Sequence, residues 1–381
     1  MTTASQYRAY YIIQSLYLVA ALFDINWLFF GLELFKTTVT RNTLIRICSV
    51  FLIFLFVKKT SDLWIYIFIL AASHLASTVY LWLKIRGLVK IVRVSKKDVL
   101  AHLPQMLILF VPTIAVSFYN YMDKVMLGSM AGTMQLGYYE NSFKITSVCS
   151  SVIGSVGIVM LPRMSNVIAN GQIDKSRKYI EISMKSVIIM ASAMAFGISA
   201  ISHDFAPVFW GEEFAACGPL LSFLAAYLPI QAFASVLRTQ YLIPNSWDKQ
   251  YTISLCIGAA CNIVFNYLLI PRLNAMGAVV GTIIAESSVC IVQSIYVRKE
   301  LPIWEYVVKS VPHLVIGLIM FSAVRFVQSF FNASVLTLIV EIAVGGFVYI
   351  VLTTVYLLKI QKEPYLINEV LKMLHIKYRF N

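Results

Sequence analysis

The chain has 381 residues, of which 59% are hydrophobic and 13% are charged, and its net charge is +13. A soluble protein cannot bury so large an apolar fraction, whereas a bilayer requires it, so the composition excludes the soluble classes. The six cysteines show no CxxC spacing and lie mostly in apolar runs. We interpret them as small packing residues, not as metal ligands or disulfide partners.

Apolar stretches of about 20 residues, the length that crosses a bilayer, recur along the whole chain. They predict an all-α integral membrane protein with about eleven transmembrane helices, joined by connections too short to fold as separate domains. The polar segment Met1–Arg8 does not resemble a signal peptide. The predicted spans are 8–30, 43–58, 64–84, 103–126, 138–161, 181–202, 218–242, 250–270, 275–297, 307–330 and 334–358.

The first span contains a carboxylate. The run Tyr10–Phe23 is interrupted only by Gln14 and Ser15, and Trp27–Phe30 continues it, which predicts that Asp24 lies inside a membrane helix. A charge at that depth costs a few kcal/mol or more, so such residues usually face a cavity or a partner.

The basic residues predict the orientation of the chain. If the N-terminus lies outside and the spans alternate, most of the 31 Lys and Arg fall on the inner connections and the tail, as the positive-inside rule requires. The outer loop His203–Pro219 has no Lys or Arg and carries three acids. The net charge therefore reflects membrane topology, and we expect a cytoplasmic C-terminus and no nucleic-acid partner. The inner cations are Lys36, Arg41, Arg46, Lys84, Arg86, Lys90, Arg93, Lys96, Lys97, Arg163, Lys175, Arg177, Lys178, Lys185, Arg238, Lys249, Arg298, Lys299, Lys309, Lys359, Lys362, Lys372, Lys377 and Arg379.

Several ordered motifs carry a family resemblance. They are the segments Phe118–Gly128 (FYNYMDKVMLG), Gln135–Lys144 (QLGYYENSFK), Leu161–Ser165 (LPRMS), Gln240–Pro244 (QYLIP), Asn262–Pro271 (NIVFNYLLIP) and Met276–Glu286 (MGAVVGTIIAE), together with the spaced residues Asp24, Trp27, Gly31 and Glu33. This pattern resembles the polysaccharide repeat-unit flippases (O-antigen, capsule and teichoic-acid type) of the multidrug/oligosaccharidyl-lipid/polysaccharide exporter superfamily, over essentially the whole chain.

The resemblance implies a MATE-like bundle of two six-helix lobes followed by two further helices. Asp24 to Glu33 resembles the end of the family's fourth helix, which would run from outside to inside. We therefore expect an N-terminal lobe that lacks its first three helices and is reduced to residues 1–95, a six-helix C-terminal lobe at 96–300, and two additional helices with a basic cytoplasmic tail at 301–381. The predicted outside start agrees with this division.

The resemblance also implies a function. The expected activity is the movement of undecaprenyl-diphosphate-linked oligosaccharide units across the bacterial plasma membrane, for export of capsule, O-antigen or related polysaccharide. The implied partners are the polyprenyl-diphosphate-linked oligosaccharide, membrane lipids, a polysaccharide polymerase and glycosyltransferases. The alternatives are a multidrug or organic-cation antiporter of the same fold, a peptidoglycan-precursor flippase and a fragment that transports nothing. An enzyme is not expected, because every loop is short and no paired carboxylates stand out.

Three cations are candidate substrate-binding residues. Lys144 is predicted about two turns below the outer end of its helix, either as a cavity cation for a diphosphate or in a structural pair with Asp123 or Glu140. We interpret Lys124 as an interfacial snorkelling residue in preference to a substrate ligand. Arg238 either meets substrate entering from the cytoplasm or is an ordinary inner-side cation. Lys185 is interpreted as a snorkelling charge.

Three acids are candidate ion-coupling residues. Asp24 and Glu286 are predicted inside helices, where each either binds H+ or Na+ or is a structural carboxylate. Asp123 lies next to an outer loop and either takes part in coupling or caps and pairs locally with Lys124. No metal site and no other cofactor is expected. Asn262 and Asn266 are interpreted as interhelical hydrogen-bonding residues, the small residues Gly277, Ala278 and Gly281 as sites of close helix approach, and His313 as an ordinary buried imidazole.

Overall fold

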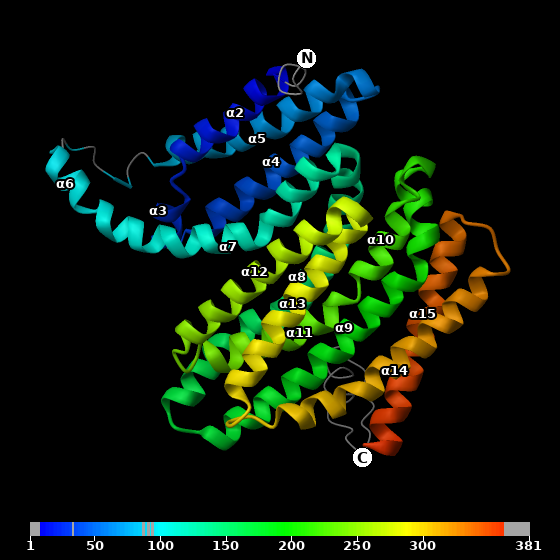
Figure 1. Cartoon of the computed structure of the whole chain (residues 1–381). Helices are drawn as coiled ribbons and strands as arrows, with labels where there is room; N and C mark the ends of the chain where they lie inside the picture. The colour runs from blue at the N-terminus through cyan, green and yellow to red at the C-terminus, as the bar shows by residue number, and fades with distance from the viewer. Residues whose placement is uncertain (1–7, 33, 86–87, 90–91, 93–94, 362–381) are drawn as a thin grey trace. The chain divides into compact units, whose positions relative to one another are not determined.

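The computed structural model describes residues 8–32, 34–85, 88–89, 92 and 95–361, and most of these residues are helical (Figure 1). Ten helices in this part of the chain are long and apolar enough to cross a membrane, which confirms the predicted all-α membrane class. The predicted span 103–126 lies in a further helix, Leu103–Met130 (α7). Glu33 and the predicted basic tail at 362–381 lie outside the described residues.

The chain divides into two compact units, residues 1–103 and 104–381. In the first unit, α2 and α4 both pack against α5, and Ile25, Phe29 and Leu81 form a small buried core. The helices of this unit are α2 (Arg8–Leu22), α3 (Asn26–Gly31), α4 (Phe35–Phe56), η1 (Thr60–Asp62), α5 (Leu63–Lys84) and α6 (Lys96–Ala101).

The first unit differs from its prediction at Asp24. This residue does not lie inside a continuous helix, because α2 ends at Leu22 and α3 begins at Asn26. Asp24 Oδ1 accepts hydrogen bonds from the Asn26 backbone N (2.8 Å) and from Asn26 Nδ2 (2.6 Å). Such a bond to the backbone two residues on competes with helical hydrogen bonding. The Asp24 side chain is therefore exposed at a break between two helices.

The second predicted span also begins earlier than expected. α4 starts at Phe35, not at residue 43, so Lys36 and Arg41 lie on a helix and not in an inner loop. The hydropathy pattern did not indicate residues 35–42 as part of the span, because Lys36 and Arg41 interrupt the apolar run there. Arg41 is tolerated there because polar neighbours surround its guanidinium, as described below.

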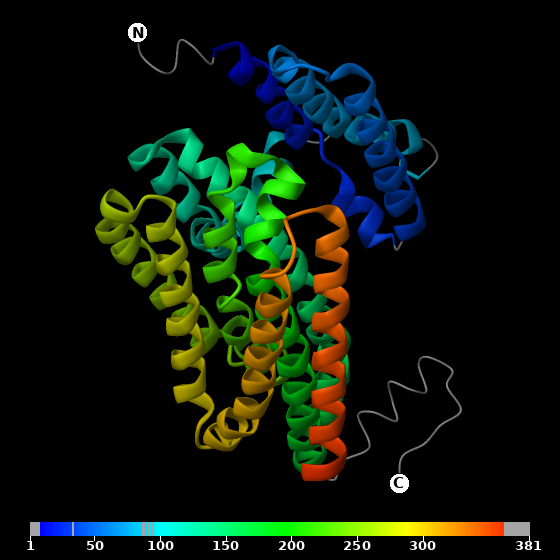
Figure 2. The same ribbon diagram turned by 90° about the vertical axis from the view of Figure 1, so that its right-hand side faces the viewer.

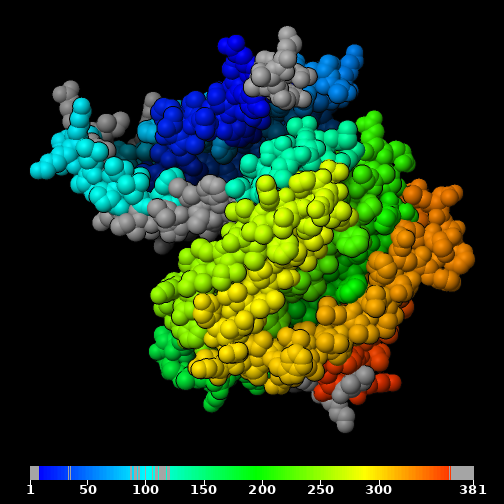
Figure 3. All heavy atoms as spheres, viewed as in Figure 1, coloured from blue at the N-terminus to red at the C-terminus, as the bar shows by residue number. Residues whose placement is uncertain are grey.

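The second unit contains the longest helices. α14 and α15 lie side by side and both contact α9 (Figures 1 and 2), while α12 and α13 pack against each other and form much of the face seen in Figure 3. After α7 come α8 (Gly132–Ala169), α9 (Ile173–Trp210), η2 (Glu212–Phe214), α10 (Cys217–Leu224), α11 (Tyr227–Leu237), the π-helix η3 (Arg238–Leu242), α12 (Asp248–Leu273), α13 (Ala275–Val297), α14 (Ile303–Gln328), α15 (Val335–Val355) and the π-helix η4 (Tyr356–Ile360).

Two helices extend well beyond their predicted apolar spans. α8 and α9 have 38 residues each, which at 1.5 Å per residue is roughly 57 Å, against a hydrocarbon core of about 30 Å. The apolar pattern indicated only the part that fits the bilayer. The polar ends continue as helix, so much of the predicted outer loop His203–Pro219 belongs to α9.

The predicted span 218–242 is divided into three pieces. α10 ends at Leu224, and α11 begins at Tyr227, two residues before Pro229. Proline lacks the N–H that would bond to the carbonyl four residues earlier, and its ring clashes with that carbonyl. The break at Ala225 and Ala226 follows from this local chemistry.

The small residues of α12 and α13 confirm the expected close approach. A Cβ added at Gly277 would lie 2.6 Å from the Leu269 carbonyl, and one at Gly281 would lie 2.0 Å from Asn266 Oδ1. Only glycine fits at these two positions without displacing α12.

Candidate functional site

A buried carboxylate connects three helices of the second unit. Asp123 on α7 is 5% exposed, and its Oδ1 accepts a hydrogen bond of 2.8 Å from the Lys124 backbone N. Its Oδ2 accepts from the hydroxyl of Tyr139 on α8, and that hydroxyl lies 2.9 Å from Thr282 Oγ1 on α13. Tyr139 is fully buried. The motif residue Asp123 is therefore held by a chain of hydroxyl groups within the bundle.

The neighbouring cation is paired with a different acid. Lys124 Nζ lies 2.9 Å from Glu140 Oε2 and 4.8 Å from the ring centroid of Phe143. Lys124 reaches Asp123 through its backbone N–H, not through its ammonium group. Lys144 follows Glu140 by one turn of α8 and is exposed. The structure thus brings Asp123, Lys124 and Glu140 together, with Lys144 on the same helix outside this cluster.

A buried amide packs against α13, the helix that carries Thr282. Asn266 on α12 is 0% exposed, and its Nδ2 donates a 3.0 Å hydrogen bond to Asn262 Oδ1. This bond lies within α12, whereas the sequence suggested bonds between helices. Asn266 Oδ1 packs against Gly281, the residue before Thr282, and it has no hydrogen-bond partner among the described residues. A buried amide oxygen without a partner carries a desolvation cost.

The chemistry of these groups is that of hard oxygen donors. One carboxylate, two hydroxyls and an amide oxygen are the ligand types of hard cations, and the carboxylate is also a proton acceptor. In the part of the chain that the structure describes, no group of three or more His, Cys, Asp or Glu side chains is arranged to hold a metal ion. With Asp123 as the one carboxylate bonded to these hydroxyls, this group of oxygens is suited to a proton or a single monovalent cation.

Of the remaining candidates of the second unit, Arg238 lies on η3 and Glu286 on α13. Arg238 is half-buried at the start of η3, with Nη2 3.3 Å from Ser235 Oγ and its guanidinium carbon 6.0 Å from the Tyr251 ring centroid. π-Helical turns are frequent at functional sites. Glu286 is half-buried on α13, one turn beyond Thr282. Its side chain is not without an interaction partner.

The first unit has a buried cation that sequence reasoning placed in a loop. Arg41 on α4 is 4% exposed. Its Nη2 donates to Asn26 Oδ1 (2.9 Å) and Asn42 Oδ1 (2.8 Å), and its Nη1 donates to the Ser77 carbonyl (3.2 Å). Because Asn26 also binds Asp24, the acid predicted for ion coupling is linked to Arg41 through one amide. This linkage joins α3, α4 and α5.

Two further residues went unassigned in the sequence. Tyr139 belongs to the Gly-Tyr-Tyr segment that supported the family resemblance, and this segment was the only signal of its role. Gln240 in η3 is fully buried, and neither atom of its amide has a hydrogen-bond partner among the described residues. The QYLIP motif contains it, but no spacing rule distinguishes it from a packing residue.

Comparison with known proteins identifies relatives in both sequence and fold. Residues 2–168 match a family model described as polysaccharide biosynthesis protein. The chain is 23% identical to an O-antigen transporter of Shigella dysenteriae, over 72% of this chain and 69% of that protein. It is 24% identical to the lipid II flippase MurJ of Bacillus subtilis, over 62% of this chain and 48% of that protein.

A solved structure shows the same fold. The inward closed conformation of a lipid II flippase MurJ matches 84% of this chain and 66% of its own chain, with a TM-score of 0.68 and 16% identity. The matched parts thus span from about half to about two thirds of these relatives' lengths. The chain is thus similar in sequence to a polysaccharide biosynthesis family and to an O-antigen transporter, and in fold to a lipid II flippase, which confirms the resemblance predicted from its motifs.

Proposed function

We propose that this chain moves undecaprenyl-diphosphate-linked oligosaccharide units across the bacterial plasma membrane and is not an enzyme. The observations that support this most are the likeness of 84% of the chain to a lipid II flippase fold and its sequence similarity to an O-antigen transporter. In this proposal, residues 96–300 form a six-helix lobe and residues 301–381 provide two further helices and a cytoplasmic C-terminus. Glycosyltransferases would act before the transport step, and a polysaccharide polymerase would act after it.

Complementation tests the proposed transport. The full chain would be expressed in a bacterial strain that lacks its own repeat-unit flippase, beside a vector control and a known flippase. We expect surface polysaccharide to be restored, measured by glycan-specific labelling of intact cells. The test is repeated in several flippase-deficient strains that make different repeat units. If the chain is stably inserted at normal abundance and restores surface polysaccharide in none of them, the proposal fails.

We further propose that Asp123 takes up H+ or Na+ during transport. Its burial and its hydroxyl partners support this assignment over Asp24, which is exposed at a helix break. A carboxylate inside a membrane bundle is costly unless it serves a pathway or a partner.

Ion binding at Asp123 has a readout that does not depend on transport. Because a ligand that binds only the folded state raises stability, the thermal midpoint of the purified chain should rise with Na+ or change with pH. Asp123→Asn should remove this dependence. Asp174→Asn, at an exposed position in the first turn of α9, is the matched control and should keep it. Equal dependence in both variants would exclude Asp123 as the site.

A further inference from the structure

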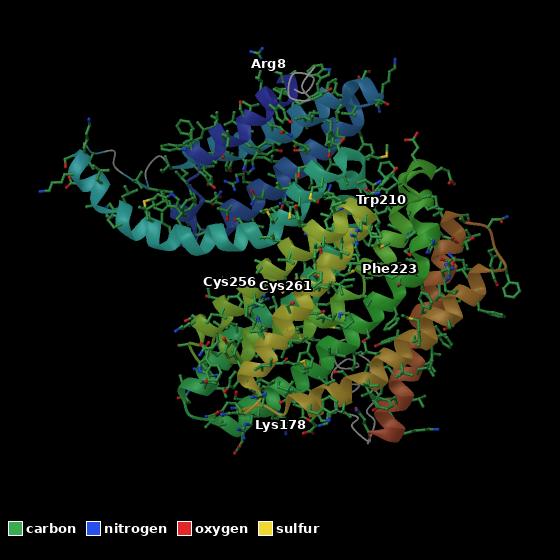
Figure 4. The ribbon with its side chains drawn as sticks, viewed as in Figure 1. Arg8, Lys178, Trp210, Phe223, Cys256 and Cys261 are labelled. Carbon is green, nitrogen blue, oxygen red and sulfur yellow. The ribbon has the colours of Figure 1, made fainter. Side chains whose placement is uncertain are left out.

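The second unit contains a cationic cavity away from the Asp123 cluster. Its volume is about 680 Å³, and it is lined by the end of α8, the first part of α9, the first part of α14 and Gln361. Figure 4 shows Lys178, one of its lining residues, at the opposite end of α9 from Trp210. Five cations and one carboxylate line the cavity: Arg163, Lys175, Lys178, Lys185, Lys309 and Glu181.

The charges are arranged so that a positive surface remains. Lys309 is neutralised, because its Nζ lies 2.6 Å from Glu181 and 2.7 Å from Glu305. Arg163 lies over the Tyr179 ring and donates a 2.7 Å hydrogen bond to the Tyr179 hydroxyl. These contacts involve uncharged groups, so the guanidinium keeps its charge and gains a fixed orientation.

The lysines of α9 share one side of the helix. Lys175, Lys178 and Lys185 are separated by three and seven residues, a spacing that brings side chains to one helix face. Lys175 and Lys178 are exposed and Lys185 is half-buried. Lys185 is twelve residues from the start of α9, roughly 18 Å along the axis. The cations therefore form a row that runs from the helix end into the cavity.

An unpartnered buried imidazole provides independent evidence for a ligand. His313 on α14 lines the cavity and is 0% exposed. Neither of its ring nitrogens has a hydrogen-bond partner among the described residues, and its ring meets the edge of Tyr356. A buried polar group without a partner costs free energy. A ligand oxygen or hydroxyl bonded to the imidazole would remove that cost.

The lining also indicates which anion fits. Lysine and arginine clusters recognise phosphate, and arginine does so in two-point geometry. Ile182, Met184 and Ile188 add apolar surface beside the cations, which suits a molecule with a hydrocarbon part. Basic pockets between transmembrane helices typically hold the head groups of anionic lipids.

We propose that this cavity binds a phosphate group, carried by the head group of an anionic membrane lipid, with the phosphate near Lys175, Lys178 and Arg163. The site lies on the face predicted to be cytoplasmic. It would couple the positions of α9 and α14 to the lipid composition of the membrane.

Lipid binding can be measured on the purified full chain in neutral detergent. Phosphatidylglycerol is added, with phosphatidylcholine as the lipid of no net charge, and inorganic phosphate and diphosphate as soluble probes. The thermal midpoint and the lipid retained in native mass spectrometry are recorded. We expect phosphatidylglycerol to raise the midpoint at concentrations where phosphatidylcholine does not. If inorganic phosphate alone raises the midpoint equally, the cavity binds phosphate, but the proposal that a lipid head group carries it is wrong.

Matched charge variants decide whether this cavity is responsible. Lys175→Gln combined with Lys178→Gln removes two exposed cations of the cavity, and we expect apparent affinity for phosphatidylglycerol to fall at least tenfold. Lys249→Gln combined with Lys299→Gln removes two exposed cations elsewhere and should leave it unchanged. Lys185→Gln alone should also weaken binding. Equal behaviour of the cavity and control variants would overturn the proposal.

Discussion

At the scale of single residues, the Tyr139 hydroxyl has the largest predicted effect on the stability of the Asp123 cluster. It donates to Asp123 on α7 and lies within hydrogen-bond distance of Thr282 on α13. Tyr139→Phe keeps the ring and removes this link, so a buried carboxylate loses a donor. We expect a loss of about 1–3 kcal/mol in stability, measured as a lower thermal midpoint of the purified protein. Tyr138→Phe, whose hydroxyl bonds to the exposed Glu213 carbonyl, should change the midpoint little. An equally small effect at Tyr139 would contradict the stabilising role of this link.

The same residues show what a sequence can predict at this scale. The Asn-x-x-Asp-Lys motif indicated Asp123 and Lys124 as a distinctive pair. Their partners depend on which faces of α7, α8 and α13 meet, and no spacing rule in one chain gives that. The sequence therefore offered Asp123 or Glu140 as a structural partner of Lys144, whereas the structure pairs Glu140 with Lys124. His313 was interpreted as ordinary because its missing hydrogen bonds are visible only in the packed structure.

At the scale of elements, the pair α12 and α13 depends on close approach at small residues, of which Gly281 gives a test. A Cβ at Gly281 would lie 2.0 Å from Asn266 Oδ1, whereas a Cβ at Gly346 on α15 has no heavy atom within 4 Å. Gly281→Ala should therefore destabilise the protein by about 1–3 kcal/mol through overpacking. Gly346→Ala should stabilise it by up to about 1 kcal/mol, because alanine is the better helix former. Thermal midpoints that shift in the same direction for both variants would refute this interpretation of the packing.

Helix positions followed from apolar runs, but helix ends did not. The apolar run predicted 181–202, yet α9 extends from Ile173 to Trp210, because polar residues outside the bilayer continue the helix without changing its hydrogen bonding. Breaks were also hidden. Asp24 reads as part of an apolar span until its carboxylate is seen bonded to Asn26, and local side-chain bonding of that kind competes with a helix in a way that hydropathy does not record.

At the scale of the whole molecule, α9 gives a direct test of orientation. One uninterrupted helix joins Lys175 in its first turn to η2 beyond its last residue, and its length of roughly 57 Å exceeds the hydrocarbon core of about 30 Å. If α9 crosses the membrane, its two ends face opposite sides. The positive-inside rule places the end with Lys175 in the cytoplasm and the end followed by Glu212 and Glu213 outside.

Cysteine labelling determines which end is outside. The six native cysteines are all free, so a background in which each is replaced by serine or alanine breaks no disulfide. In that background, Lys175→Cys and Glu212→Cys place single thiols at exposed positions on the two sides. We expect a membrane-impermeant maleimide to label Glu212→Cys in intact spheroplasts, and Lys175→Cys only after the membrane is permeabilised. Reversed labelling would invert the predicted topology and move the cationic cavity to the outer face, whereas labelling of both thiols in intact spheroplasts would mean that α9 does not separate two compartments.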